Sequence, residues 1–343
     1  MKYTNKIIIF LVFLTIFSCS EDTESDWKKI KSETAPAIRF DSCSFYRIKN
    51  NSFYILAGRA SENRIYNDIW RFDLSSEQWS SVTTPTGTKI DSGGRMNYCS
   101  YDNKNDILYL YGINGSGNTL PSNILKWTLK DNKMEEIALS SLPDTSLRGH
   151  SLTLLKSKLA EPSLIIFGGE DTGNTLNNDI RIFSLVSKTF EKLEVSGEKP
   201  LARMNHTAIL SSDNKLIIIG GKSNSGALND AWSFDFTTKK WEKLSSATLL
   251  KGYYNSNFYN ESDNSVIFYG GKDLNGNISN FLKYDISNNT WKEIDSSPEP
   301  GSLSGASIML SSDNKFYLFG GSLINDKNES VSVNETWKYQ GIK

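Results

Sequence analysis

Short runs of apolar residues, each closed by glycine, recur along the chain at nearly constant intervals. The run Leu216–Ile219 is followed by Gly220 and Gly221. Equivalent runs are followed by Ala57, Gly112, Gly168, Gly270 and Gly320, at intervals of 50 to 56 residues. The runs are short and rich in β-branched and aromatic residues, which indicates strands rather than helices. A period near 50 residues is typical of chains built from repeated four-stranded sheets.

A second constant spacing divides each repeat into strands. A polar turn residue precedes the large side chain of the last strand by 11 residues in five repeats: Asp68 and Trp79, Asn123 and Met134, Asp179 and Phe190, Asp230 and Trp241, Asn280 and Trp291. The recurrence of these acidic and amide residues is typical of turn residues and not of a catalytic carboxylate. We therefore predict an all-β, six-bladed propeller with four antiparallel strands per blade and no amphipathic helix.

The sixth repeat predicts how the ring closes. Its fourth strand would begin beyond the last residue, Lys343, but the segment Trp27–Ile30 has the same pattern as Trp241–Leu244. We expect residues 27–30 to complete the last blade, which leaves no open sheet edge. The predicted propeller is one domain spanning residues 27–343.

A glycine pair, an Asn-Asp turn before a Trp or Phe strand, and a final Trp-x-x-Leu resemble the kelch repeat, from about Asp26 to the end of the chain. The resemblance extends distantly to the galactose oxidase central domain and to the N-acetylneuraminate epimerase family. Ala57 and Met134 depart from the repeat, and Gly112 is followed by Ile113. Two of these departures fall in the second repeat, so we expect blade 2 to be the least regular.

The first residues resemble a bacterial lipoprotein signal. Lys2 and Lys6 precede an apolar run from Ile7 to Phe17, which is too short to span a bilayer and suits a signal peptide over residues 1–18. The resemblance implies that Cys19 becomes the acylated N-terminus, followed by an acidic tether over residues 19–26. The expected location is the bacterial envelope, at the outer membrane, with exposure on the cell surface as a further alternative. A secreted protein with a plain spacer is the alternative.

Cysteine content and net charge narrow the function further. Cys43 and Cys99 occupy matching positions in the first strands of their blades, where we expect buried thiols rather than a disulfide. The chain has 38 basic and 39 acidic residues, which gives no reason to expect nucleic acid as a partner.

Basic residues are predicted to gather at one mouth of the central channel. The first strands are expected to start there, and the residues after the glycine pairs should return to the same face. The two sets are Arg39, Arg95, Arg148, Arg203, Tyr253 and Leu303, and Arg59, Asn114, Glu170, Lys222, Lys272 and Ser322. Guanidinium groups bind carboxylates and sulfates through two hydrogen bonds. The kelch resemblance implies ligand-binding roles for the five arginines, although each could instead bond backbone carbonyls of a neighbouring blade.

Other candidate residues favour packing over chemistry. Tyr98, Tyr253 and Tyr254 could stack on a sugar ring, although blade packing is the commoner role. His150 and His206 are the two histidines and stand at equivalent positions; they lack further ligands for a metal, so no metal or other cofactor is expected.

Three functions fit these features. The first is an envelope-anchored module that binds an anionic glycan, a peptide or a protein on the basic rim, through Arg39, Arg59, Arg95, Arg148, Arg203, Lys222, Lys272 and Tyr253. The second is an enzyme resembling the sialic acid mutarotases, with Glu170 and His150 as candidate acid–base residues. The third is a structural scaffold of the envelope.

Overall fold

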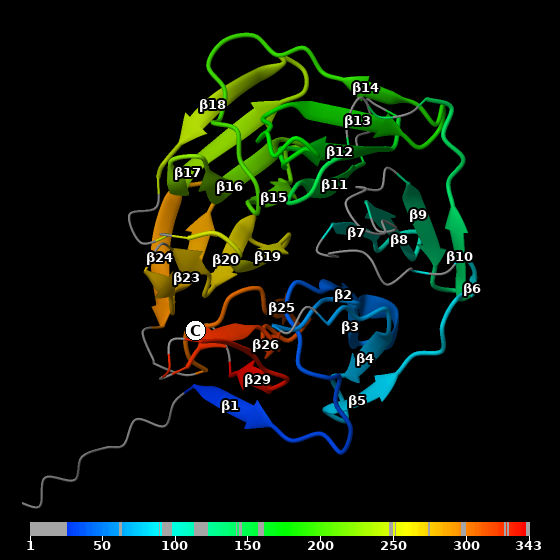
Figure 1. The fold of residues 1–343 in the computed structure, drawn as a ribbon, viewed down its shortest axis with the longest axis vertical. Helices are drawn as coiled ribbons and strands as arrows, with labels where there is room; N and C mark the ends of the chain where they lie inside the picture. Colours follow the sequence, from blue (N-terminus) through cyan, green and yellow to red (C-terminus); the bar gives the residue numbers. More distant parts are fainter. Residues whose placement is uncertain are drawn as a thin grey trace, which may run out of the picture.

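Six four-stranded antiparallel sheets form a ring around a central axis in the computed structural model (Figure 1). The structure describes residues 26–61, 64–88, 90, 98–112, 123–141, 143, 146–156, 161–246, 250, 252–273, 275–295, 300–325, 327 and 329–340. Within these ranges the only helical element is the short 3-10 turn Ile48–Asn50. The predicted six-bladed propeller is confirmed. The predicted signal peptide, Cys19 and all of the tether except Asp26 lie outside the described residues.

Each blade runs from an inner strand at the axis to an outer strand at the periphery (Figure 1). Blade 1 comprises β2 (Cys43–Arg47), β3 (Ser52–Leu56), β4 (Ile69–Asp73) and β5 (Gln78–Ser81). Blade 2 comprises β7 (Cys99–Asp102), β8 (Ile107–Tyr111), β9 (Ile124–Thr128) and β10 (Lys133–Glu136). Blade 3 comprises β11 (Ser151–Leu155), β12 (Ser163–Phe167), β13 (Ile180–Ser184) and β14 (Phe190–Lys192).

Blades 4 to 6 continue the ring. Blade 4 comprises β15 (Thr207–Leu210), β16 (Leu216–Ser223), β17 (Gly226–Asp235) and β18 (Lys240–Leu244). Blade 5 comprises β19 (Ser256–Asn260), β20 (Ser265–Tyr269), β23 (Phe281–Asp285) and β24 (Thr290–Asp295). Blade 6 comprises β25 (Ser307–Leu310), β26 (Phe316–Phe319), β29 (Thr336–Tyr339) and β1 (Trp27–Ile30).

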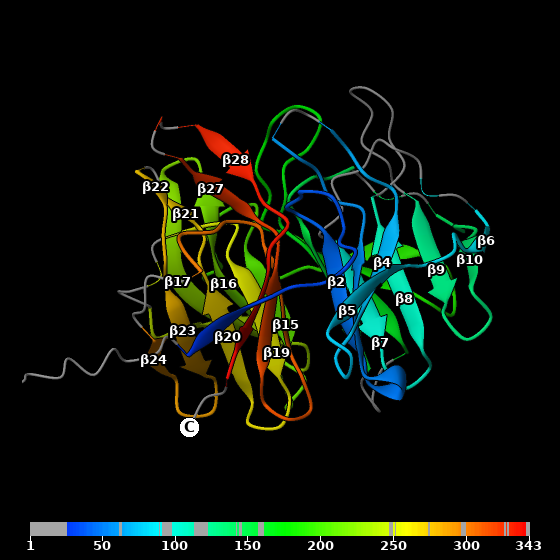
Figure 2. The ribbon, with the colours of Figure 1, turned by 90° about the horizontal axis from the view of Figure 1, so that it is seen from below.

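Short additional strands distinguish some blades. In blade 2, β6 (Thr86–Gly87) adds a parallel fifth strand outside β10, where a Cβ at Gly87 would lie 2.3 Å from the carbonyl oxygen of Met134. In blades 5 and 6, the hairpins β21 (Lys272–Asp273) with β22 (Gly276–Asn277), and β27 (Ser322–Ile324) with β28 (Ser330–Ser332), project from one face of the ring (Figure 2). No helix within the described part of the chain is long and apolar enough to cross a membrane.

The hydrophobic core lies between the blades, not in one central layer. Each of the six apolar clusters joins two neighbouring sheets, as in the cluster of Phe167 and Trp232 between blades 3 and 4. The outer-strand tryptophans contribute to this core, since Trp241 packs 5.3 Å from Phe167 and Trp79 packs 4.7 Å from Phe319 between ring centroids. Each blade is therefore stabilised by both of its neighbours.

The first and last strands of the domain pair in one sheet. Strand β1 is antiparallel to β29, with Trp27 opposite Tyr339 and Ile30 opposite Thr336. Trp27 is buried, with its ring 5.4 Å from Tyr269 and 5.3 Å from Phe281 of blade 5. The predicted closure by residues 27–30 is confirmed.

Replacing Trp27 with alanine should lower the free energy of unfolding by about 3–5 kcal/mol, because it leaves a cavity between blades 5 and 6. Lys28→Ala changes an exposed side chain of the same strand and serves as the control. Urea unfolding followed by tryptophan fluorescence measures both variants, and equal midpoints would contradict the role assigned to this strand.

Cys43 and Cys99 form a disulfide, so the expectation of two buried thiols is wrong. Their Cα atoms lie 5.9 Å apart on β2 and β7, the inner strands of blades 1 and 2. The two strands face each other across the blade boundary at matching register, which brings the sulfur atoms within bonding distance. Disulfides of this kind are typical of oxidising compartments.

We expect the paired substitution Cys43→Ala and Cys99→Ala to cost about 2–4 kcal/mol of stability, because the bridge restricts the unfolded chain. Peptide mass spectrometry after alkylation in denaturant, with and without reductant, tests the bridge directly. Labelling of both cysteines without reductant would refute it.

Candidate functional site

The starts of the inner strands and the residues after the glycine pairs meet at one channel mouth. Isolated bridges join Phe40 to Arg59, Arg148 to Glu170, Met204 to Lys222, Tyr253 to Lys272 and Ser304 to Ser322. The expectation that the two sets share one rim is confirmed for the five blades in which these residues are described.

The bridges also correct the alignment of the first set. Arg148 and Tyr253 stand at the position of Phe40 and Met204, one residue after Arg39 and Arg203. A shift of one residue turns a side chain in extended backbone to the opposite side. The arginines of the rim therefore fall into two structural groups.

Arg39 and Arg203 belong to the first group and are buried. The guanidinium of Arg39 donates to both carboxylate oxygens of Asp68 at 2.5 and 2.8 Å, and to the carbonyl oxygens of Ala37 and Ala57. Arg203 donates in the same way to Asp230 at 2.6 and 2.8 Å, and to two carbonyls of its own blade. The guanidinium groups of Arg39 and Arg203 are therefore bound to groups of the protein itself.

The turn carboxylates thus have a second role that the repeat pattern did not reveal. Burial alone would raise the pKa of Asp68 and Asp230, but the hydrogen bonds and charge of the arginines hold both below the usual value. Trp70 and Trp232 also donate from their indole nitrogens to these carboxylates. The turn, the arginine and the third strand of the blade are therefore fixed together.

Arg59 and Arg148 lie on the rim and are each paired with a carboxylate. Arg59 is 2.8 Å from Asp41, and Arg148 is 2.6 Å from Glu170. The Arg148 side chain is 37% exposed, so its ion pair is in contact with solvent. Arg95 lies outside the described residues, as does Asn114.

Lys222 and Lys272 differ from these arginines. Both are half-buried, and within the described part of the chain neither forms an ion pair. Lys222 Nζ lies 5.5 Å from the ring centroid of Tyr253. The backbone of Tyr253 both donates a hydrogen bond to the backbone of Lys272 and accepts one from it. Burial and the nearby carboxylate of Asp273 raise the pKa of Tyr253. We name Lys222, Tyr253 and Lys272 the lysine patch.

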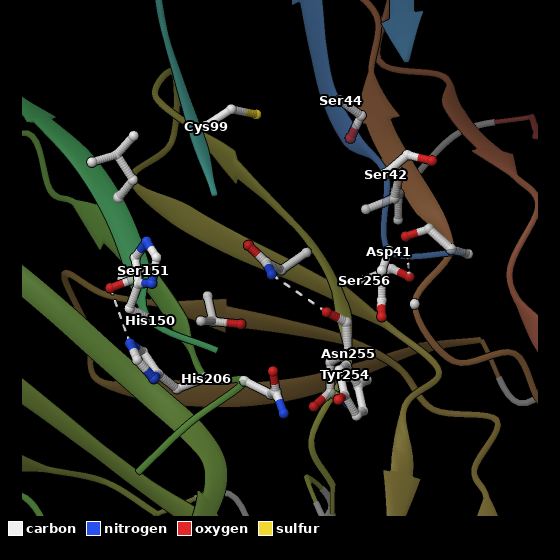
Figure 3. A pocket seen from close by; sticks show the side chains of 18 residues that line it. Asp41, Ser42, Ser44, Cys99, His150, Ser151, His206, Tyr254, Asn255 and Ser256 are labelled. Atoms are coloured by element: carbon white, nitrogen blue, oxygen red, sulfur yellow. Dashed lines mark hydrogen bonds between the residues drawn. The ribbon is translucent and has the colours of Figure 1, made fainter. Parts of the chain in front are cut away.

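Below the rim, all six blades enclose a cavity of about 220 Å³ in the channel (Figure 3). The residue that leads into the inner strand has positive φ in five blades: Asp41, Gly149, Asn205, Tyr254 and Gly305. The next residue, His150 or His206 in blades 3 and 4, lies against the second glycine of its pair. A Cβ at Gly169 or Gly221 would come within 2.9 and 2.8 Å of the histidine Cβ.

The cavity wall is mostly polar and uncharged. Its polar residues include Ser42, Ser44, Ser151, Asn205, Asn255, Ser256 and Asn257, beside His150 and His206. Burial lowers the pKa of each histidine to about 3, so both are neutral at pH 7. His206 Nε2 lies 3.0 Å from Ser151 Oγ (Figure 3). Sequence reasoning missed the serines and asparagines, which carry no motif; the recurring Asn, Asp or Gly before the inner strand was the available signal.

Chemistry by Glu170 and His150 has little geometric support. Glu170 accepts a hydrogen bond from Arg148, while His150 packs against Tyr98 with ring centroids 4.1 Å apart. Tyr98 in turn accepts a hydrogen bond from the backbone of Gly149, a role in blade packing. Among the described residues, no group of three metal-ligating side chains comes together.

Replacing Arg203 with alanine should cost about 3–5 kcal/mol, because Asp230 is left largely buried without its counter-charge. Arg148→Ala removes a solvent-exposed pair and should cost about 1 kcal/mol or less. Denaturant unfolding of the two variants compares them, and similar losses would contradict the division of the arginines into two groups.

Family models match most of the propeller. The KLHDC2/KLHL20/DRC7 Kelch-repeats domain matches residues 158–341, more than half of the chain. The Kelch motif matches residues 48–86.

Several eukaryotic proteins are similar to the chain. Acyl-CoA-binding domain-containing protein 5 of Arabidopsis thaliana is 26% identical over 56% of this chain and 30% of its own length. Kelch repeat-containing protein 2 of Saccharomyces cerevisiae is 25% identical over 61% of this chain and 24% of its own. Tip elongation aberrant protein 3 of Schizosaccharomyces pombe is 27% identical over 64% of this chain and 21% of its own length. The chain thus spans less than a third of each of these relatives.

Proposed function

Since the chain belongs to the kelch-repeat family, we propose that it is a protein-interaction module of the bacterial envelope that binds an acidic segment of its partner on the lysine patch. Kelch propellers generally bind proteins, and the channel mouth carries the projecting hairpins of blades 5 and 6 (Figure 2). The partner would lie across this face.

The observation that supports this proposal is a difference in ion pairing between the arginines and the lysines of the rim. Arg39, Arg59, Arg148 and Arg203 are each paired with a carboxylate of the protein. The lysines of the patch have no such partner within the described ranges. A partner carboxylate would therefore gain a new ion pair at the lysines, whereas at the arginines it would have to displace an internal one.

Export rests on two independent features. The pattern of residues 1–18 and Cys19 resembles a lipoprotein signal, and the disulfide between Cys43 and Cys99 suits an oxidising compartment. We therefore place the module outside the cytoplasm, anchored to the membrane by an acylated Cys19.

Binding of a fluorescent deca-glutamate peptide, followed by anisotropy at low and moderate salt, tests the lysine patch. The double variant Lys222→Glu and Lys272→Glu should weaken binding at least about tenfold, with the largest difference at low salt. The double variant Lys239→Glu and Lys240→Glu, at the exposed start of the edge strand β18, makes the same charge change elsewhere and should have little effect.

Equal binding by the double variant and the control would refute the patch as the site. A sulfated oligosaccharide titrated in parallel distinguishes the partner class. If the oligosaccharide binds through the lysines and the peptide does not, the partner is an anionic glycan and the protein-binding proposal fails.

A further inference from the structure

The wall of the channel cavity contains buried polar groups that the described protein does not satisfy. His150 is 4% exposed, and neither of its ring nitrogens makes a well-aligned hydrogen bond with the described residues, although the backbone of Leu147 lies near enough to act on its pKa. His206 Nδ1 likewise has no hydrogen-bond partner among these residues. Buried polar atoms without partners are rare in native proteins, and each calls for a water, an ion or a ligand. In Figure 3 both imidazoles border the cavity.

The polar atoms form a ring above a deeper level of mixed apolar and polar side chains. The successive levels follow the inner strands: Asp41, Asn205 and Tyr254 stand at the mouth, Ser42, His150, His206 and Asn255 come next, and Leu152, Ala208 and Ile308 line the deep end together with Ser44 and Asn257. Hydroxyl, amide and imidazole groups offer both donors and acceptors. An occupant would thus meet hydrogen-bonding groups at its sides, and the apolar side chains of Leu152, Ala208 and Ile308 beside Ser44 and Asn257 beneath.

The electrostatics of the wall favour an uncharged occupant. Both histidines are neutral at pH 7, because burial lowers their pKa values to about 3, although the backbone of Leu147 acts in the opposite direction on His150. Asp41 is paired with Arg59 at 2.8 Å, so its charge is already compensated. The buried guanidiniums of Arg39 and Arg203 are bonded to Asp68 and Asp230. An ionised ligand would have to lose its hydration without gaining a free counter-charge.

The volume limits the size of the occupant. At about 220 Å³ the cavity is smaller than the sites of drug-sized ligands, which measure roughly 300–1,000 Å³. It is nevertheless much larger than the space that one water molecule needs.

We propose that the channel cavity binds a small uncharged polyhydroxyl compound of monosaccharide size, held by His150, His206, Asn205 and Asn255. Its hydroxyl groups would donate to and accept from the ring nitrogens and amides, while its C–H face rests on Leu152 and Ile308. This site is separate from the lysine patch and does not depend on an acidic partner.

Saturation-transfer NMR and calorimetric titration of the full chain with D-galactose, D-glucose and myo-inositol test the proposal. At least one compound should bind saturably. His150→Leu should weaken that binding at least about tenfold while leaving the melting temperature unchanged or higher, since it removes buried atoms that lack partners. Asn205→Gly removes a second contact and keeps the left-handed backbone, whose φ is 52°.

Lys240→Glu, far from the channel on β18, should bind as the unmodified protein does and is the control. Absence of saturable binding by all three compounds overturns the proposal, because the cavity would then hold water alone. The proposal is also overturned if the His150→Leu and Asn205→Gly variants bind with the same affinity as the unmodified protein. A marked fall in the melting temperature of His150→Leu would show that the ring is satisfied within the protein, which removes the basis of the inference.

Discussion

The pairing of β1 with β29 is the constraint on which the rest of the molecule depends. Every apolar cluster lies between two blades, so a blade without a neighbour would expose one of its faces. The ring removes such faces only when its two ends share a sheet. Trp27 helps to close the ring in two ways. Its backbone pairs with β29 in its own blade, and its ring packs against aromatic rings of blade 5. Stability is in this way a property of the closed circle.

Within the circle, charge is used mainly to fix the rim. Arg39 and Arg203 join a turn carboxylate to the start of an inner strand, and the tryptophan of the third strand binds the same carboxylate. Such an ion pair is costly to break by removing the carboxylate, because the guanidinium is fully buried and would be left without its counter-charge. The repeated arginines are thus part of the scaffold, and two lysines on blades 4 and 5 remain to meet a partner.

The channel mouth therefore has two distinct surfaces. The lysine patch is cationic and lies on the rim, where a partner can reach it along with the hairpins of blades 5 and 6. The cavity below is neutral, polar and narrow, and it depends on glycines that let the chain approach the histidine positions closely. Their different chemistry would allow one face to bind both of the proposed partners, a macromolecule and a small molecule, by separate means.

The sequence by itself determined the blade count, the strand order and the closing segment, because each follows from a local period that is repeated along the chain. It also placed His150 and His206 at equivalent positions. Only the tertiary structure showed that Arg148 faces the rim while Arg203 is buried. The one-residue shift behind this difference can be seen in the sequence, because Arg148 precedes its histidine by two residues and Arg203 precedes its histidine by three, but which register is buried depends on the packed blades. Likewise, the bond between Cys43 and Cys99 and the shared polar cavity depend on how close neighbouring blades lie, a distance that residues far apart in the chain set together.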